Sequence, residues 1–258
     1  MRIAFALLLG ACARYVDGPE PSVLAVVNHQ EPLRQPAVVC NAQGDATAGW
    51  QVDVLGEGFA VLPTGKAGGK ATALLPEVTL TGPEPFAVPA ERTRFFDSGR
   101  LVLELPTSDS ASAKALTVGS YALAVRNPDS QTTKLGTALT VVGPPRVDTV
   151  KLVDATGQEI DPVIRADQTQ KVVIHGDGFR PDAKPVVTIG AARIPDADVS
   201  VTAPTTLTLT VRSGTLAAGT SQSVRVANPE GCAAPRGADP TGFGITEVRV
   251  VGSAGAAP

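Results

Sequence analysis

The sequence is poor in the residues that most often carry catalysis or contact nucleic acids. Its 258 residues include two histidines and one tryptophan, and aromatic residues make up 4% of the chain. The chain therefore offers few residues for an active site that depends on histidine. The formal net charge of −3 supplies no basic field, so we expect no nucleic-acid partner and no charge-driven binding to anionic lipid. With so few large rings, the hydrophobic cores must consist mainly of Val, Leu, Ile and Ala.

Long apolar runs are also missing. The run at residues 3–9 follows Arg2 and is too short to cross a bilayer. It leads into residues 9–12, which read LGAC and resemble the lipobox of bacterial lipoprotein precursors. This resemblance implies that residues 1–11 are removed as a signal peptide and that Cys12 becomes lipidated, which would anchor the protein to a membrane. The alternative is an ordinary secretory signal that is cleaved after Ala11 or Ala13.

The residues after Cys12 bear on the location. Ala13 and Arg14 follow the cysteine, whereas some lipoproteins retained at the inner membrane carry an aspartate there. By that resemblance we expect a lipid anchor in the outer membrane. The protein would lie on either the periplasmic or the outer face. Residues 12–20 contain Gly18 and Pro19 and are expected to form a short lipidated tether.

The chain contains an internal duplication. Residues 52–59 read VDVLGEGF, and residues 172–179 read VVIHGDGF. Later landmarks follow in the same order, because LVLEL at 101–105 is matched by LTLTV at 207–211, and VRNPD at 125–129 by VANPE at 226–230. The sequence therefore predicts two domains of the same kind, at residues 21–142 and 145–251. Between them lies Gly143-Pro144-Pro145, a short and stiff linker. Residues 252–258 are expected to form a disordered tail.

Hydrophobic residues alternate with other residues in both repeats, for example at Leu101, Leu103 and Leu105. This period of two predicts half-buried strands. Clusters of Gly, Pro, Asn and Asp separate the strands and leave no room for long helices. We therefore expect an all-β protein of two immunoglobulin-like antiparallel β-sandwiches with about seven strands each.

In each repeat the glycines of G-x-G-F can adopt a positive φ, and the phenylalanine can close the end of the sandwich. The repeats resemble the IPT/TIG family of immunoglobulin-like domains. The resemblance is carried by an early Pro and β-branched strand, an apolar strand ending in G-x-G-F, and a late strand ending in Asn-Pro-Asp/Glu. It implies a spacer, adhesion, dimerisation or sugar-binding role rather than catalysis. The residues expected to form this structural turn are Gly56, Gly58, Phe59, Gly176, Gly178 and Phe179.

The sequence gives little support for a phosphate-binding, histidine-based or calcium-binding site. Residues 65–70 lack the glycine spacing and the hydroxyl residue of a phosphate-binding loop, and a solvated hairpin is expected there. His175 aligns with Leu55 of the first repeat, which favours a structural role. Loop carboxylates raise the possibility of calcium, but their spacing fits no EF-hand, so we expect no metal and no cofactor. These carboxylates are Asp154, Glu159, Asp161, Asp167, Asp196 and Asp198.

Two further cysteines, Cys40 and Cys232, are present in a chain expected to be exported. In a sandwich of the family that the repeats resemble, the loops carrying these cysteines would both face the linker. The resemblance therefore implies an interdomain disulfide, with two separate thiols as the alternative.

Together these features predict a lipid-anchored protein of the cell envelope that is not an enzyme and acts as an interaction or adhesion module. Its partner would be a protein or a glycan. The alternatives are a carbohydrate-binding accessory module that serves a separate enzyme, and a periplasmic structural spacer in an envelope assembly.

Overall fold

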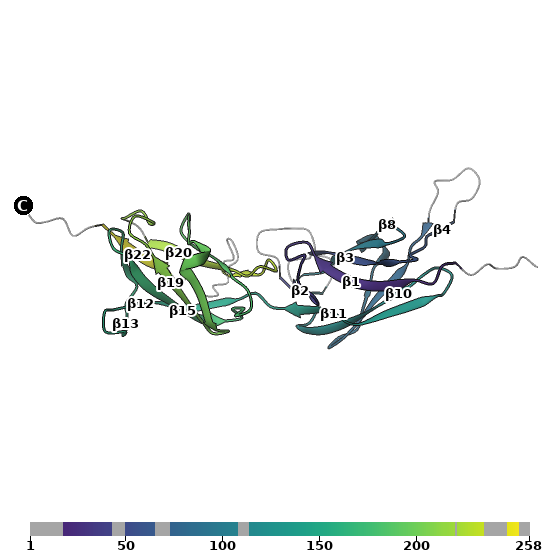
Figure 1. The fold of residues 1–258 in the computed structure, drawn as a ribbon, viewed down its shortest axis with the longest axis horizontal. Coiled ribbons are helices and arrows are strands. Elements are labelled where there is room, and N and C mark those ends of the chain that lie inside the picture. The colour runs from purple at the N-terminus through teal and green to yellow at the C-terminus, as the bar shows by residue number, and fades with distance from the viewer. Residues whose placement is uncertain are drawn as a thin grey trace, which may run out of the picture.

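A computed structural model describes residues 18–42, 50–64, 73–107, 114–219, 221–234 and 247–252. The chain forms two β-sandwiches that lie end to end in an elongated molecule (Figure 1). The helical segments of the described part are two single 3-10 turns, η1 (Ala90–Arg92) and η2 (Asp196–Asp198). The expectation of an all-β protein with two tandem immunoglobulin-like sandwiches is thus confirmed.

The first sandwich packs a four-stranded sheet against a five-stranded sheet. In spatial order, the first sheet consists of β1 (Ser22–Asn28), β3 (Trp50–Glu57), β9 (Arg100–Leu105) and β8 (Thr93–Asp97). The second consists of β2 (Ala37–Cys40), β11 (Thr132–Val142), β10 (Gly119–Arg126), β6 (Glu77–Thr81) and β7 (Phe86–Val88). A separate two-stranded hairpin is formed by β4 (Leu62–Pro63) and β5 (Ala73–Leu74).

The second sandwich repeats this plan. One sheet has the order β13 (Glu159–Ile160), β12 (Arg146–Val153), β15 (Gln170–Asp177), β19 (Thr206–Val211) and β18 (Val199–Ala203). The other has the order β14 (Val163–Arg165), β22 (Glu247–Val251), β20 (Ser221–Ala227), β16 (Val186–Ile189) and β17 (Ala192–Arg193), and β21 (Ala233–Ala234) also pairs with β20.

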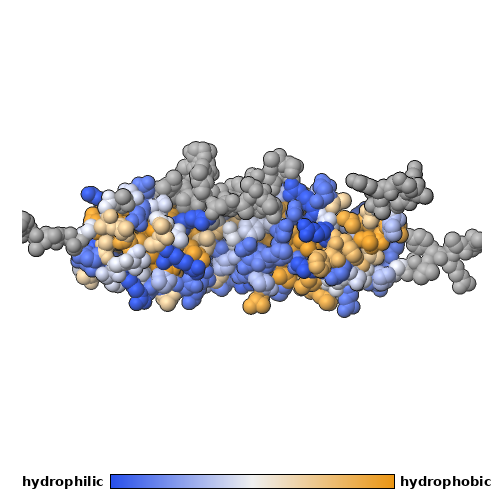
Figure 2. Space-filling view, turned by 90° about the horizontal axis from the view of Figure 1, so that it is seen from above, coloured by the Kyte–Doolittle hydropathy of each residue, from blue (hydrophilic) through white to orange (hydrophobic). Residues whose placement is uncertain are grey.

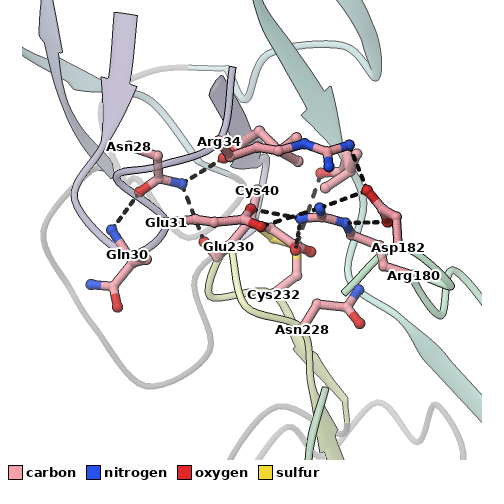
Figure 3. Close-up of polar contacts among 12 residues, drawn as sticks. Asn28, Gln30, Glu31, Arg34, Cys40, Arg180, Asp182, Asn228, Glu230 and Cys232 are labelled. Carbon is pink, nitrogen blue, oxygen red and sulfur yellow. Dashed lines mark hydrogen bonds and ion pairs between the residues drawn. A yellow bond between two sulfur atoms is a disulfide. The ribbon is translucent and has the colours of Figure 1, made fainter. Parts of the chain in front are cut away.

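Two details differ from the expected antiparallel sandwich of about seven strands. Short strands at the sheet edges, such as β7, β13 and β17, raise the number of strands in each sandwich. In addition, β2 pairs with β11 in parallel, and β14 pairs with β22 in parallel. In the first domain the chain crosses to the other sheet directly after β1, whereas in the second it first forms β13 beside β12 and then crosses. The crossing segment of the first domain, residues 29–36, lies at the end that faces the second domain (Figure 3).

The cores follow the alternation in the sequence. Leu101, Leu103 and Leu105 are buried in the first sandwich, and Leu207, Leu209 and Val211 are buried in the second. Each core also contains the phenylalanine of its G-x-G-F turn, because Phe59 and Phe179 are both buried.

The turn glycines have specific steric roles. Gly58 and Gly178 have positive φ values of 70° and 74°, a conformation that favours glycine. A Cβ on Gly56 would clash with the backbone oxygen of Ser22, and one on Gly176 would clash with that of Arg146. The repeated glycines therefore allow the first strand of each domain to approach the turn closely.

Candidate functional site: the interdomain junction

The most elaborate polar and covalent arrangement in the described part of the chain joins the two sandwiches. Cys40, at the end of β2, forms a disulfide with Cys232, which follows β20 in the second domain. Their Cα atoms are 5.4 Å apart, and both residues are buried. Ala42 completes this small cluster, and Trp50 and Val142 pack against it. The junction thus has an apolar core of its own, with a covalent bond at its centre.

An arginine beside the disulfide forms ion pairs across the domain boundary. Arg180 follows Phe179 in the turn of the second repeat. Its Nη1 atom donates hydrogen bonds of 2.8 Å to both Glu31 Oε2 of the first domain and Glu230 Oε2 of the second. Arg180 Nε also donates to Asp182 Oδ1 at 3.2 Å. Figure 3 shows the guanidinium between these carboxylates, beside the disulfide.

Burial and hydrogen bonding shift the pKa values of the charged groups in this network. The side chain of Glu230 is fully buried, and that of Arg180 is 11% exposed. Burial raises the pKa of Glu230 above its ordinary value of 4.5, although the hydrogen bond from Arg180 acts in the opposite direction. Burial alone would lower the pKa of Arg180, but the hydrogen bonds to the surrounding carboxylates outweigh it and raise this pKa. The hydrogen bond from Arg180 lowers the pKa of Asp182. The guanidinium is therefore charged, and it compensates carboxylates from both domains.

The crossing segment of the first domain, residues 29–36, supplies the remaining contacts and is called the hook here. Arg34 of the hook forms an ion pair with Asp182 of the second domain. At the base of the hook, Asn28 is buried; its Nδ2 atom donates to the backbone oxygen of Val38 and, at 3.5 Å, to that of Glu230. The hook therefore holds the second domain through side-chain and main-chain contacts at once.

The repeated Asn-Pro motif has a structural role that sequence reasoning did not assign. Asn127 Nδ2 donates to the backbone oxygen of Gly58 at 2.8 Å, and Asn228 Nδ2 donates to that of Gly178 at 2.9 Å. Both asparagines are buried. In each domain the asparagine thus connects the loop after the late strand to the G-x-G-F turn, which explains why the two motifs recur together.

The structure brings Cys40 and Cys232 together and places the six turn residues at equivalent positions in their domains. It does not bring the histidines together. His29 Nε2 lies 2.9 Å from Asp53 in the first domain, and His175 Nε2 lies 2.9 Å from Glu159 in the second. Cys12 and the segment at residues 65–70 lie outside the described residues.

Five of the six loop carboxylates considered for calcium, all except Asp167, have other polar contacts. Asp154 accepts backbone hydrogen bonds from Thr156 and Gln158, which is a turn arrangement. Asp198 forms two hydrogen bonds of 2.7 Å with Arg212. Within the described ranges, no group of three or more His, Cys, Asp or Glu side chains is arranged to hold a metal ion.

Sequence reasoning missed Arg180, Glu31 and Glu230. One signal could have found Arg180, because the aligned position after the phenylalanine of the first repeat is Ala60. A large charged residue that replaces alanine next to a buried phenylalanine needs a partner. The identity of the partner was not readable, because Glu31 lies 149 positions away in the sequence.

Searches with family models and among curated proteins find no match for this chain. Among solved structures, the chain is similar to the surface glycan-binding protein PbSGBP-B of Prevotella bryantii, with 10% identity, a TM-score of 0.31, and coverage of 84% of this chain and 41% of that one. It is also similar to SGBP-B from a xyloglucan utilization locus of Bacteroides uniformis, with 15% identity, a TM-score of 0.28, and coverage of 83% and 48%. The I9–I11 tandem of titin has 10% identity, a TM-score of 0.32, and coverage of 90% and 66%.

The chain therefore spans less than half of the length of the two glycan-binding proteins. At these identities the likeness concerns the fold alone, and no function follows from it. Within the described ranges, no helix has the length and apolar character needed to span a membrane.

Proposed function

We propose that this protein is a non-enzymatic interaction module of the cell envelope. A lipid on Cys12 would anchor it in the outer membrane. The observation that carries the proposal is the junction. A disulfide, the Arg180–Glu31 ion pair and the Arg34–Asp182 ion pair of the hook hold two sandwiches end to end. Such a joint stops the domains from swinging independently, so the molecule acts as a stiff arm that presents its far end at a set distance from the membrane.

The distribution of reactive groups supports a binding role rather than catalysis. Each histidine pairs with a carboxylate of its own domain, at 36% and 37% side-chain exposure. Among the described residues, neither ring is hydrogen-bonded to a serine or a cysteine. Nucleophilic catalysis requires such a neighbour. The partner in this proposal is a protein, which meets the arm away from the membrane.

A carbohydrate-binding accessory role is the second candidate, and one observation favours it. Phe96 on the edge strand β8 is 61% exposed, and Arg100 lies 4.8 Å from the centre of its ring. An exposed ring of this kind can stack against a sugar. In the described part of the chain, however, Phe96 is the only exposed aromatic side chain, whereas a glycan platform is usually built from several.

The test combines fractionation with crosslinking. Wild-type protein and Cys12→Ser are expressed in the native bacterium, and intact cells are treated with protease, beside a periplasmic control protein. We expect the wild type in the membrane fraction and Cys12→Ser in the soluble fraction. Cleavage of the wild type in intact cells would place the arm on the outer face, whereas protection would place it in the periplasm. A soluble wild type would refute the anchor.

The partner is tested separately. In-cell crosslinking should yield one stoichiometric protein partner with wild type. If purified protein instead binds a polysaccharide panel saturably, and Phe96→Ala abolishes this binding while Leu24→Ala does not, the glycan role replaces the protein role. Leu24 is a suitable control because it is also exposed, on the opposite edge strand of the same sheet.

A further inference from the structure

The β4–β5 hairpin of the first domain exposes an apolar surface that the fold does not use. Val61 and Leu62 are 36% and 46% exposed, and Leu74 is 51% exposed. Leu62 and Leu74 are paired directly across the two strands. Cross-strand neighbours lie close together on one hairpin, so the two leucines form a continuous apolar patch. Orange surface is visible at this end of the first domain, next to the grey atoms (Figure 2).

The hairpin begins beside the chain that enters the first domain. The backbone N–H of Ala60 donates to Asn127 Oδ1 at 3.1 Å. The Nδ2 atom of the same asparagine donates to the backbone oxygens of Gly58 and, at 3.4 Å, of Pro19. Two loops therefore meet at one buried side chain: the start of the hairpin and the end of the tether. In Figure 1 both lie at the end of the molecule opposite the second domain.

The tether itself is held against this end. Gly18 N–H donates to Asp129 Oδ2 at 3.1 Å, and Gln131 Nε2 donates to the backbone oxygen of Gly18 at 2.8 Å. Cys12 precedes Gly18 by six positions in the sequence. Even a fully extended chain of six residues spans only about 20 Å. A lipid on Cys12 would therefore keep this end of the domain, with the hairpin, close to the membrane surface.

We propose that the β4–β5 hairpin is a membrane-contact element, in which Val61, Leu62 and Leu74 rest in the interfacial layer of the bilayer beside the lipid anchor. The proposal rests on lipidation of Cys12. The residues from 60 to 76 include no Asp or Glu, so the hairpin itself adds no carboxylate that an anionic surface would repel.

A lipid surface fits this patch better than a protein partner. Stable protein interfaces bury about 800 Å² on each side, which is far more than three aliphatic side chains provide. Apolar side chains next to an anchor need no such area, since the anchor already keeps them at the bilayer. With contacts at both the anchor and the hairpin, the arm has a defined tilt relative to the membrane.

The test measures the depth of the hairpin in a bilayer. Full-length lipidated protein carrying Leu74→Trp is reconstituted into vesicles of phosphatidylethanolamine and phosphatidylglycerol that contain brominated phosphatidylcholine. The matched control is Leu33→Trp, because Leu33 is 96% exposed in the hook, at the opposite end of the domain. Trp50 is present in both proteins and gives the same background. We expect bromine to quench the new tryptophan at position 74 at least about twofold more than that at position 33.

Equal quenching of the two variants would overturn the proposal, as would crosslinking of position 74 to a protein in place of lipid. A second substitution sharpens the result. Adding Leu62→Ser to Leu74→Trp should reduce the quenching, whereas adding Leu24→Ser, on β1, should not.

Sedimentation of the wild-type protein with vesicles tests separately whether Cys12 carries a lipid. If Cys12 is not lipidated, wild-type protein does not sediment with vesicles, and both proposals fall together. If wild type sediments and the tryptophan at position 74 stays unquenched, the anchor stands and the hairpin proposal alone is wrong.

Discussion

Removal of the guanidinium at the junction should produce a pH-dependent loss of stability. In Arg180→Met, the buried Glu230 loses the donor that contacts its Oε2 atom at 2.8 Å. Its Oε1 atom is already buried with no hydrogen-bond partner among the described residues. Breaking a buried ion pair from one side costs about 3–5 kcal/mol, whereas the more exposed pairs of Arg180 with Glu31 and Asp182 contribute about 0–1 kcal/mol each. At pH 7 we expect a total loss of about 3–7 kcal/mol.

The sign of the pH dependence follows from Glu230. Burial raises the pKa of Glu230 even in the wild type. The loss of Arg180 removes a hydrogen bond that lowers it, so the pKa rises further. The folded variant then binds more protons than the unfolded chain at pH values between 4.5 and the raised pKa. Its stability should therefore increase as the pH falls through this window. Asp182 adds no opposite trend in the variant, because the main cause that lowers its pKa in the wild type is the hydrogen bond from Arg180, which the variant lacks.

Urea unfolding at pH 7 and pH 5 checks this prediction, followed by the fluorescence of Trp50, which packs against the junction. In Arg180→Met/Glu230→Gln the pH dependence should disappear, because the amide does not titrate. Arg193→Met is the matched control, since its partner Asp196 and its own side chain are both exposed, and it should be close to neutral. An equal loss at both pH values in Arg180→Met would refute the reasoning.

Three further predictions concern the disulfide and the repeated turn. Cys40→Ser/Cys232→Ser should lower the free energy of unfolding by about 2–4 kcal/mol and broaden the interdomain distances seen by small-angle scattering; wild type in reductant should behave alike. Gly176→Ala should cost about 1–3 kcal/mol in urea unfolding, because its Cβ meets backbone, whereas Gly136→Ala, with open space around it, should be neutral. Asn228→Ala should cost about 1–3 kcal/mol in calorimetry, since it leaves the Gly178 oxygen without its donor; an unchanged melting temperature would contradict this role.

The fold was readable from the sequence because its signals are local. Alternation such as that of Leu207, Leu209 and Val211 specifies which face of a strand is buried, and it does so within five positions. The G-x-G-F turns are equally local, since their glycines are required by the backbone of the same turn. The same reasoning underestimated the number of strands, because very short edge strands such as β17 leave almost no periodic pattern.

The junction was only partly readable. The disulfide pairing came from a resemblance that placed both cysteine loops near the linker. The hook, in contrast, reads as an ordinary polar loop, because the partners of Glu31 and Arg34 lie in another domain. No local pattern encodes an ion pair over 149 positions. The lipobox, the domain boundaries and the tether remain predictions that experiments must test.

The disulfide gives the two domains a second covalent connection. The polypeptide crosses from one sandwich to the other once, at residues 143–145, and the bond between Cys40 and Cys232 crosses the same boundary again, 192 positions apart in sequence. Linkers between domains are the usual place for proteolytic cleavage. A single cut at Gly143 would open a covalent ring without releasing the second sandwich. The protein therefore tolerates one break in this linker and loses its second sandwich only after the disulfide is also broken.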